Sequence, residues 1–204
     1  PSCVAAVIDN MQHSHSFERK LWECFLLCGS WYEAVLLTGY GSDDTIEAYL
    51  AAVEAKRVNR DIDMSKLNVV YTPLHGSGNK PVRAILSKIG ASNVTVVPEQ
   101  ELPNGNFPTA PYPNPEIRQA FECALKLAET VKPDLLLATD PDCDRVGIAV
   151  LSGNEYVLLS GNDVGVLLTE YMLSARKEKG TLPEKSLMTK SFVSIKKIRA
   201  VSSA

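Results

Sequence analysis

The most informative segment of this 204-residue chain is Asp134-Leu-Leu-Leu-Ala-Thr-Asp-Pro-Asp-Cys-Asp-Arg-Val-Gly-Ile-Ala-Val150. The apolar run 135–138 predicts a buried strand, and a second apolar run, 146–151, predicts that the chain returns to the same sheet. Three acidic residues stand at alternate positions between these runs: Asp140, Asp142 and Asp144. The stretch therefore predicts two strands joined by an acidic loop.

The alternate spacing of the three aspartates predicts a metal site. Residues two apart on an extended backbone point in the same direction, so the three carboxylates are expected to converge. Converging negative charges repel each other and need a neutralising partner. Mg²⁺ suits this role because it prefers oxygen ligands, usually a few carboxylates together with phosphate and water. Arg145 follows at once, and its planar guanidinium suits the oxygens of a phosphate group.

Three other interpretations compete with a magnesium site. An EF-hand loop needs Gly at its sixth position and Glu at its twelfth, where this sequence has Arg145 and Leu151, so an EF-hand is rejected. A phosphatase-type D-x-D-x-T loop would need Thr where Asp144 stands, so the sequence matches that motif poorly. A solvated acidic turn is the third alternative, since Asp and Pro both favour turns. The metal site is preferred because three alternating aspartates directly after a buried strand are more than a turn requires.

A second candidate site follows the strand predicted at 67–74. The turn His75-Gly-Ser-Gly78 lies between this strand and a helix predicted at 79–89. Such a glycine-rich turn exposes backbone N–H groups at the positive end of a helix, where they can face a phosphate. The turn is therefore a candidate phosphate-binding or active-site loop, formed by His75, Gly76, Ser77 and Gly78. The alternative for His75 is a turn histidine that makes only local hydrogen bonds.

The acidic loop resembles the magnesium loop of a known family. Asp140-Pro-Asp-Cys-Asp-Arg145 is similar to the D-P-D-x-D-R loop of the α-D-phosphohexomutases, which are the phosphoglucomutases and phosphomannomutases. The His75-Gly-Ser-Gly78 turn resembles the H-G-x-G loop that opens the second domain of these enzymes. Two proline-rich segments are also similar to segments of the family: Pro103-Asn-Gly-Asn-Phe-Pro108 and Pro113-Asn-Pro-Glu116. The resemblance covers residues 43–194.

The remaining pattern predicts an α/β fold. Helices are expected at 43–60, 79–89, 114–130 and 164–177, and strands at 67–74, 94–98, 135–138, 146–151, 156–159 and 186–194. Alternation of strands and helices favours a mostly parallel sheet that is covered on both faces, with an antiparallel hairpin at its edge. We therefore predict a three-layer sandwich similar to the second phosphohexomutase domain, and we read the polar loop 99–113 as architecture.

Three segments organise the chain in this interpretation. Residues 1–42 stay unassigned, 43–153 form the second phosphohexomutase domain with its metal loop, and 154–204 are the truncated start of a third domain. The family's phosphoserine motif, of the T-A-S-H-N-P kind, does not occur in the sequence, so we expect a fragment or a diverged amino end. A zinc module is an alternative for the amino-terminal segment, with these candidate ligands: His13, His15, Cys24 and Cys28.

Composition narrows the classes of partner. The formal net charge of −3 argues against a nucleic-acid partner, and a hydrophobic content of 45% is ordinary for a globular protein. No apolar run approaches the roughly 18 residues that are needed to span a membrane. Five scattered cysteines without a C-x-x-C motif favour reduced thiols, so we expect a cytoplasmic protein.

The resemblance implies a Mg²⁺-dependent isomerase, an intramolecular phosphotransferase that acts on hexose phosphates through a phosphoserine. It implies that Asp140, Asp142 and Asp144 bind Mg²⁺ and that Arg145 is the catalytic residue that offsets charge on the transferring phosphoryl group. We expect this polypeptide alone to bind metal but to have little or no mutase activity. The alternative is a non-catalytic metal-binding or interaction module with a mutase-like core, and a serine domain encoded upstream would argue against it.

Overall fold

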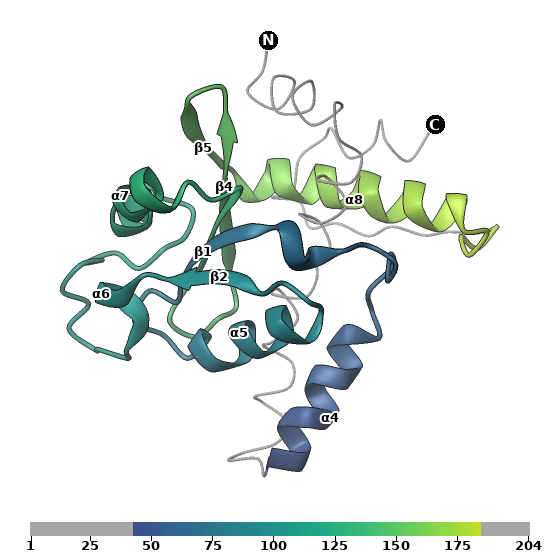
Figure 1. Ribbon diagram of the computed structural model, residues 1–204, viewed down its shortest axis with the longest axis horizontal. Coiled ribbons are helices and arrows are strands. Elements are labelled where there is room, and N and C mark those ends of the chain that lie inside the picture. Colours follow the sequence, from purple (N-terminus) through teal and green to yellow (C-terminus); the bar gives the residue numbers. More distant parts are fainter. Residues whose placement is uncertain (1–42, 185–204) are drawn as a thin grey trace.

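Five strands form one mixed sheet in the order β2-β1-β3-β4-β5 (Figure 1). The computed structural model describes residues 43–184 of the chain. The strands are β1 (Asn68–Thr72), β2 (Asn93–Val96), β3 (Leu135–Thr139), β4 (Val146–Ser152) and β5 (Glu155–Leu159). β2, β1 and β3 run parallel, whereas β4 and β5 add an antiparallel hairpin beside β3. The predicted α/β class and the edge hairpin are therefore confirmed.

Helices cover both faces of the sheet, which gives the predicted three layers. The helices are α4 (Asp43–Glu54), α5 (Asn79–Lys88), α6 (Pro98–Glu101), α7 (Glu122–Val131) and α8 (Gly161–Glu178), with 3₁₀ turns η1 (Met64–Lys66) and η2 (Arg118–Phe121). One core cluster joins the sheet to α4, α5 and α8, and a second cluster joins the opposite face to η2 and α7. Figure 1 shows α5 and α7 on opposite sides of the strands.

β3 is the central strand and is buried on both faces. Leu135 and Leu137 belong to the cluster beneath α5, whereas Leu136 and Ala138 belong to the cluster beneath α7. All four side chains are 0% exposed. Burial of a leucine side chain contributes about 1.5–3 kcal/mol to folding, so this short run supplies much of the core. The uninterrupted apolar pattern of β3 follows from having a helix layer on each side.

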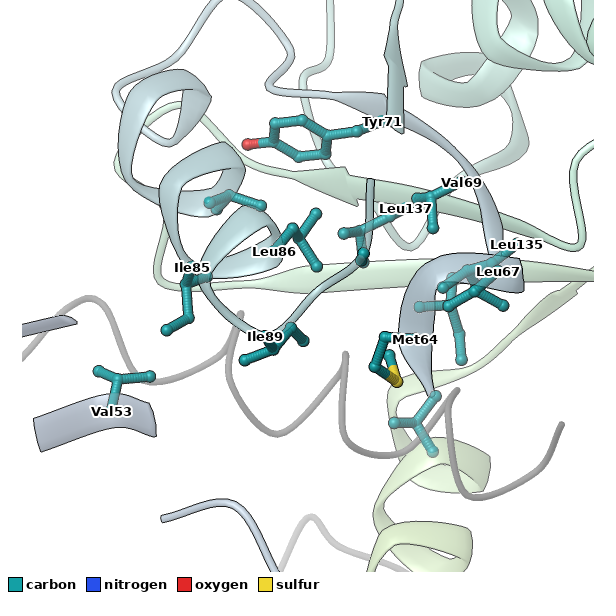
Figure 2. Packing of buried hydrophobic residues seen from close by; sticks show 14 of the residues in the cluster. Val53, Met64, Leu67, Val69, Tyr71, Ile85, Leu86, Ile89, Leu135 and Leu137 are labelled. Carbon is teal, nitrogen blue, oxygen red and sulfur yellow. The ribbon is translucent and has the colours of Figure 1, made fainter. Parts of the chain in front are cut away.

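The cluster beneath α5 surrounds the strand that leads to the glycine-rich turn. Figure 2 shows Leu67, Val69 and Tyr71 at and along β1, facing the α5 side chains and the adjacent β3 leucines. The α5 contribution comes from its buried apolar face: Val82, Ile85 and Leu86. Because β1 and β3 pair in parallel, this core holds their carboxyl ends side by side.

The predicted end of the first helix and the predicted start of the third are wrong. The first helix ends at Glu54 rather than near residue 60, and Lys56 N and Arg57 N bond to carbonyls three residues back, at 2.9 and 3.0 Å. The Arg57 side chain donates hydrogen bonds to the Ile62 and Ile89 carbonyls, at 2.9 and 3.4 Å. Asn114 does not begin the helix predicted at 114–130. Its side chain instead accepts a hydrogen bond from Glu116 N at 2.9 Å, and Ile117 stays extended before η2 and α7.

The last described helix begins three residues earlier than predicted. The sequence predicts that residues 161–163 cap a helix beginning near 164, but α8 begins at Gly161 and its cap is Ser160. Ser160 Oγ accepts a hydrogen bond from Asp163 N at 3.2 Å and donates one to Asp163 Oδ2 at 2.7 Å. A serine cap satisfies an amide that a helix start otherwise leaves without a partner.

Residues 155–178 pack with the rest of the described chain. β5 pairs with β4, and α8 contributes Val164, Leu167 and Tyr171 to the core cluster beneath α5. The proposed domain boundary at 153 stays a prediction, as do the zinc ligands in 1–42 and the strand at 186–194, which lie outside the described residues. Within residues 43–184, no helix combines the length and hydrophobicity that crossing a bilayer requires.

Candidate metal centre

The acidic loop lies at the carboxyl end of β3, where parallel α/β sheets place ligands. The carboxylate oxygens of its three aspartates lie within 4.8 Å of one another: Asp140, Asp142 and Asp144. The spacing predicted that an extended backbone would bring these side chains together, but the backbone of the loop is not extended. Cys143 N instead donates to the Asp140 carbonyl at 3.0 Å, and Cys143 has a left-handed backbone with φ 62°. A tight turn therefore brings the three side chains to one point.

The hairpin ladder continues into the loop and fixes Asp140. Its backbone N–H donates to the Arg145 carbonyl at 3.4 Å, and Arg145 N donates to Asp140 Oδ1 at 2.9 Å. Asp140 is buried, at 7% exposed, whereas Asp142 and Asp144 are exposed. The site thus has one anchored inner carboxylate and two outer carboxylates that are open to solvent.

Burial and negative neighbours raise the pKa of Asp140 from its ordinary value of 3.8 to about 7. Loss of solvation on burial is the largest cause; the hydrogen bond from Arg145 N opposes it and lowers the pKa. A hydrogen bond with the Asp144 carboxyl and the charges of Asp142 and Asp144 raise the pKa further. The raised pKa of Asp140 therefore reflects burial first and the neighbouring negative charges second.

Arg145 lies beside the carboxylates and is itself open to solvent. Its Nε lies 3.9 Å from Asp140 Oδ2 and 3.8 Å from Asp144 Oδ1, and its side chain is 59% exposed. Neither distance is a tight ion pair, and an exposed pair contributes little to stability. The Arg145 guanidinium is therefore not committed to a close ion pair, and its role toward an anion stays a prediction.

The residues present fit a hard divalent cation. The donor set consists of carboxylate oxygens, which are the ligands that Mg²⁺ prefers, and two of them face solvent, so that water or phosphate can complete the coordination. The negative charges of Asp142 and Asp144, which contribute to the raised pKa of Asp140, would be offset by such an ion. Asp140, Asp142 and Asp144 would hold the ion, with Arg145 beside it.

The pKa of Asp140 predicts an unusual pH dependence for the metal-free protein. The folded-state pKa, about 7, lies above the ordinary value of 3.8, so the folded state binds the proton more tightly than the unfolded chain. The contribution of Asp140 to the free energy of unfolding therefore rises as pH falls from about 7 to about 4. In EDTA, urea titrations of the wild type and Asp140→Asn are expected to diverge in this window, with the flatter profile in the variant. Parallel profiles would contradict the prediction.

The His75 side chain is enclosed by the chain rather than turned toward a ligand. It is 5% exposed, its Nδ1 lies 3.1 Å from the Leu102 carbonyl, and its Nε2 lies 3.0 Å from Thr109 Oγ1. Because a carbonyl can only accept, Nδ1 carries the proton in this arrangement. The ring also meets Phe107 edge to face, with centroids 6.2 Å apart. His75 thus ties the β1–α5 turn to the 102–109 segment, which supports the architectural reading of that loop.

The amides of the glycine-rich turn are also engaged within the protein. His75 N donates to the Gln100 carbonyl at 2.9 Å, Gly76 N to the Pro73 carbonyl at 2.8 Å, and Ser77 N to the Pro141 carbonyl at 2.8 Å. Three successive donors that were candidates for a phosphate therefore have protein partners. The phosphate-binding interpretation of His75, Gly76, Ser77 and Gly78 stays a prediction; Ser77 bonds to the acidic loop, whereas His75 bonds to residues 100–109.

Residues behind the acidic loop form a buried support that the sequence pattern did not reveal. Tyr71 Oη and Thr139 Oγ1 lie 2.8 Å apart, at the carboxyl ends of β1 and β3. Cys143 is buried, at 2% exposed, and burial is the largest cause that raises the pKa of its thiol to about 11. A Cβ on Gly78 would lie 2.7–2.8 Å from the side chains of all three residues. In the sequence, the one sign of this close packing is the glycine at position 78, next to the predicted acidic loop in space.

The fold and the loop define the class: an α/β protein with a carboxylate cluster at the carboxyl end of the central strand of its sheet. The chain belongs to the phosphoglucomutase/phosphomannomutase family. The family model for "Phosphoglucomutase/phosphomannomutase, alpha/beta/alpha domain II" matches residues 47–153. This span contains both the glycine-rich turn and the acidic loop, so the resemblance drawn from the sequence is confirmed.

Several curated proteins are similar to this chain. A phosphomannomutase of Mycoplasmoides pirum is 30% identical over 78% of the chain and 28% of its own length. A phosphoglucomutase of Staphylococcus saprophyticus is 36% identical over 70% of the chain and 26% of its own length. A phosphoribomutase of Saccharomyces cerevisiae is 36% identical over 65% of the chain and 23% of its own length. The chain therefore spans about a quarter of the length of these relatives.

Proposed function

We propose that this chain supplies the metal-binding part of a Mg²⁺-dependent phosphosugar mutase. The observation that carries the proposal is the convergence of three carboxylates within 4.8 Å at the carboxyl end of β3, in a chain of this family. When bound there, Mg²⁺ supplies a Lewis acid for a phosphoryl oxygen. Glucose and mannose phosphates are the first candidates for the substrate, and the similarity to a phosphoribomutase of yeast makes pentose phosphates a further candidate.

The protein's own groups have separate tasks in this proposal. The buried Asp140, held by Arg145 N, is the fixed ligand that sets the position of the ion. Asp142 and Asp144 complete the negative charge from the solvent side. Arg145 lies beside the cluster and offsets the charge of the phosphoryl group as it moves between donor and acceptor oxygens. Phosphoryl transfer depends mainly on such positioning and charge stabilisation.

Magnesium binding by the purified chain tests the proposal. Mg²⁺ is expected to raise the thermal unfolding midpoint, because a ligand that binds only the folded state stabilises it by about 2.7 kcal/mol at a hundred times its dissociation constant. NaCl at matched ionic strength is the control, since simple screening of the three charges would raise stability without a specific ion. Equal effects of MgCl₂ and matched NaCl would remove the proposal.

Catalysis by the isolated polypeptide is a separate question. The expectation of little or no turnover can be tested by following conversion of glucose 1-phosphate to glucose 6-phosphate with the purified chain. Robust turnover would show that groups assigned to other segments, the phosphoserine first among them, are present in these 204 residues.

A further inference from the structure

The glycine-rich turn after β1 lies directly against the acidic loop after β3. Ser77 donates two hydrogen bonds to the Pro141 carbonyl, from its backbone N at 2.8 Å and from Oγ at 3.1 Å. Pro141 stands between Asp140 and Asp142, so these bonds hold the segment that carries two of the candidate metal ligands. The glycine-rich turn and the acidic loop, which the sequence predicted as separate sites, are therefore in direct contact in the structure.

Gly76 allows this contact by having no side chain. A Cβ at this position would overlap the Pro141 Cα and would lie 2.6 Å from the Pro141 oxygen and 2.8 Å from its carbonyl carbon. These are backbone atoms, so no side-chain rotation can relieve the overlap. Gly76 is not among the residues with positive φ, so close approach rather than backbone conformation requires glycine here.

The turn is held from its other side, away from the acidic loop. His75 is bonded through both ring nitrogens to the 102–109 segment, and its amide is bonded to Gln100. Gln100 Oε1 also accepts a hydrogen bond from Thr72 Oγ1 at 2.7 Å, which ties α6, directly before this segment, to the end of β1. The turn therefore stands between a fixed support and the acidic loop.

We propose that residues 75–77 are positioning residues for the metal site, with Gly76 and Ser77 setting the place of Pro141 and His75 anchoring the turn. This inference rests on the proposed metal site and assigns the turn a task other than phosphate binding. A ligand set holds an ion tightly only when its supporting contacts fix the ligands, and loss of such a contact commonly weakens metal affinity by about 10–100-fold.

The first test compares Gly76→Ala with Gly165→Ala in α8, whose new Cβ has no neighbour within 4 Å. The dissociation constant and line shape of bound Mn²⁺ are measured by electron paramagnetic resonance, with the metal-free melting midpoint recorded alongside. Gly76→Ala is expected to weaken Mn²⁺ binding by about tenfold or more and to change the line shape. Gly165→Ala is expected to match the wild type in Mn²⁺ affinity and line shape. Wild-type affinity and line shape in a folded Gly76→Ala would overturn the inference.

The second test uses Ser77, an exposed residue whose substitution spares the core. Loss of one hydrogen bond in Ser77→Ala is expected to weaken Mn²⁺ binding by about threefold to fivefold, and Ser77→Thr is expected to restore it. If Gly76→Ala does not fold, the Mn²⁺ affinities of Ser77→Ala and Ser77→Thr test the inference in its place. Unchanged Mn²⁺ affinity in Ser77→Ala, with weaker binding of inorganic phosphate, would favour a phosphate loop and overturn the inference. Absence of Mn²⁺ binding in the wild type would instead overturn the proposed function.

Discussion

Asp142→Ala is expected to abolish the Mg²⁺-dependent rise in the melting midpoint and to weaken Mg²⁺ binding by about 100-fold or more. Removal of a partner that only supports a ligand costs about 10–100-fold in affinity, so removal of a ligand itself should reach or exceed that range. Asp142 is exposed, and the substitution creates no cavity in the core. Isothermal titration with MgCl₂ and thermal unfolding at about pH 8 measure the two effects, with Glu129→Ala as a control of equal charge change on the exposed surface of α7.

The same variant carries a second signature in the absence of metal. The charge of Asp142 is one of the causes that raise the pKa of Asp140, so its removal lowers that pKa toward the ordinary value. The metal-free variant should therefore be slightly more stable than the wild type near neutral pH, because ionised Asp140 has one negative neighbour fewer. General damage to the fold would lower stability with and without metal. A full Mg²⁺ response in Asp142→Ala would show that the ion binds elsewhere.

Gly147→Ala is expected to lower the free energy of unfolding by about 3 kcal/mol or more. Gly147 is buried in β4, opposite Ala138 of β3, and a Cβ there would overlap the Pro115 oxygen and lie 2.7 Å from the Pro115 carbonyl carbon. Both neighbours in this contact are backbone, so either β4 or the 113–116 segment must move. Urea unfolding followed by circular dichroism measures the loss.

Gly165→Ala is the matched control for Gly147→Ala. Gly165 lies inside α8, and a Cβ there would have no neighbour within 4 Å. Alanine in place of glycine within a helix favours folding by about 0.5–1 kcal/mol, so this variant should be more stable than the wild type. If Gly147→Ala lowers the free energy of unfolding and Gly165→Ala raises it, the loss in Gly147→Ala is caused by the close approach of Pro115. A change of less than about 0.5 kcal/mol in Gly147→Ala would contradict the packing described.

Much of the site was predictable because its signals are local. A buried strand, a break at Pro141 and three alternating acids occur within one short stretch, and each has a direct physical meaning. The conformation that brings the acids together was not predictable, because a left-handed Cys143 produces a turn in place of an extended segment. The start of the helix after Asn114 was missed for a related reason, since Pro115 packs against Gly147, more than thirty residues later.

The α/β class, the order of the strands and of the longer helices from β1 to α8, and the identity of the carboxylate cluster could be predicted from the sequence. The short helix α6 was missed, because it lies where a strand end and a polar loop were predicted. Periodic burial and the chemistry of adjacent side chains are properties of short segments, so these features can be read without the fold. The inward position of His75, and the contact of the turn containing Gly76 and Ser77 with the acidic loop at Pro141, arise from long-range packing and could not be predicted. Contacts between carboxyl ends of neighbouring parallel strands join residues more than sixty positions apart, and they exist only once the sheet has formed.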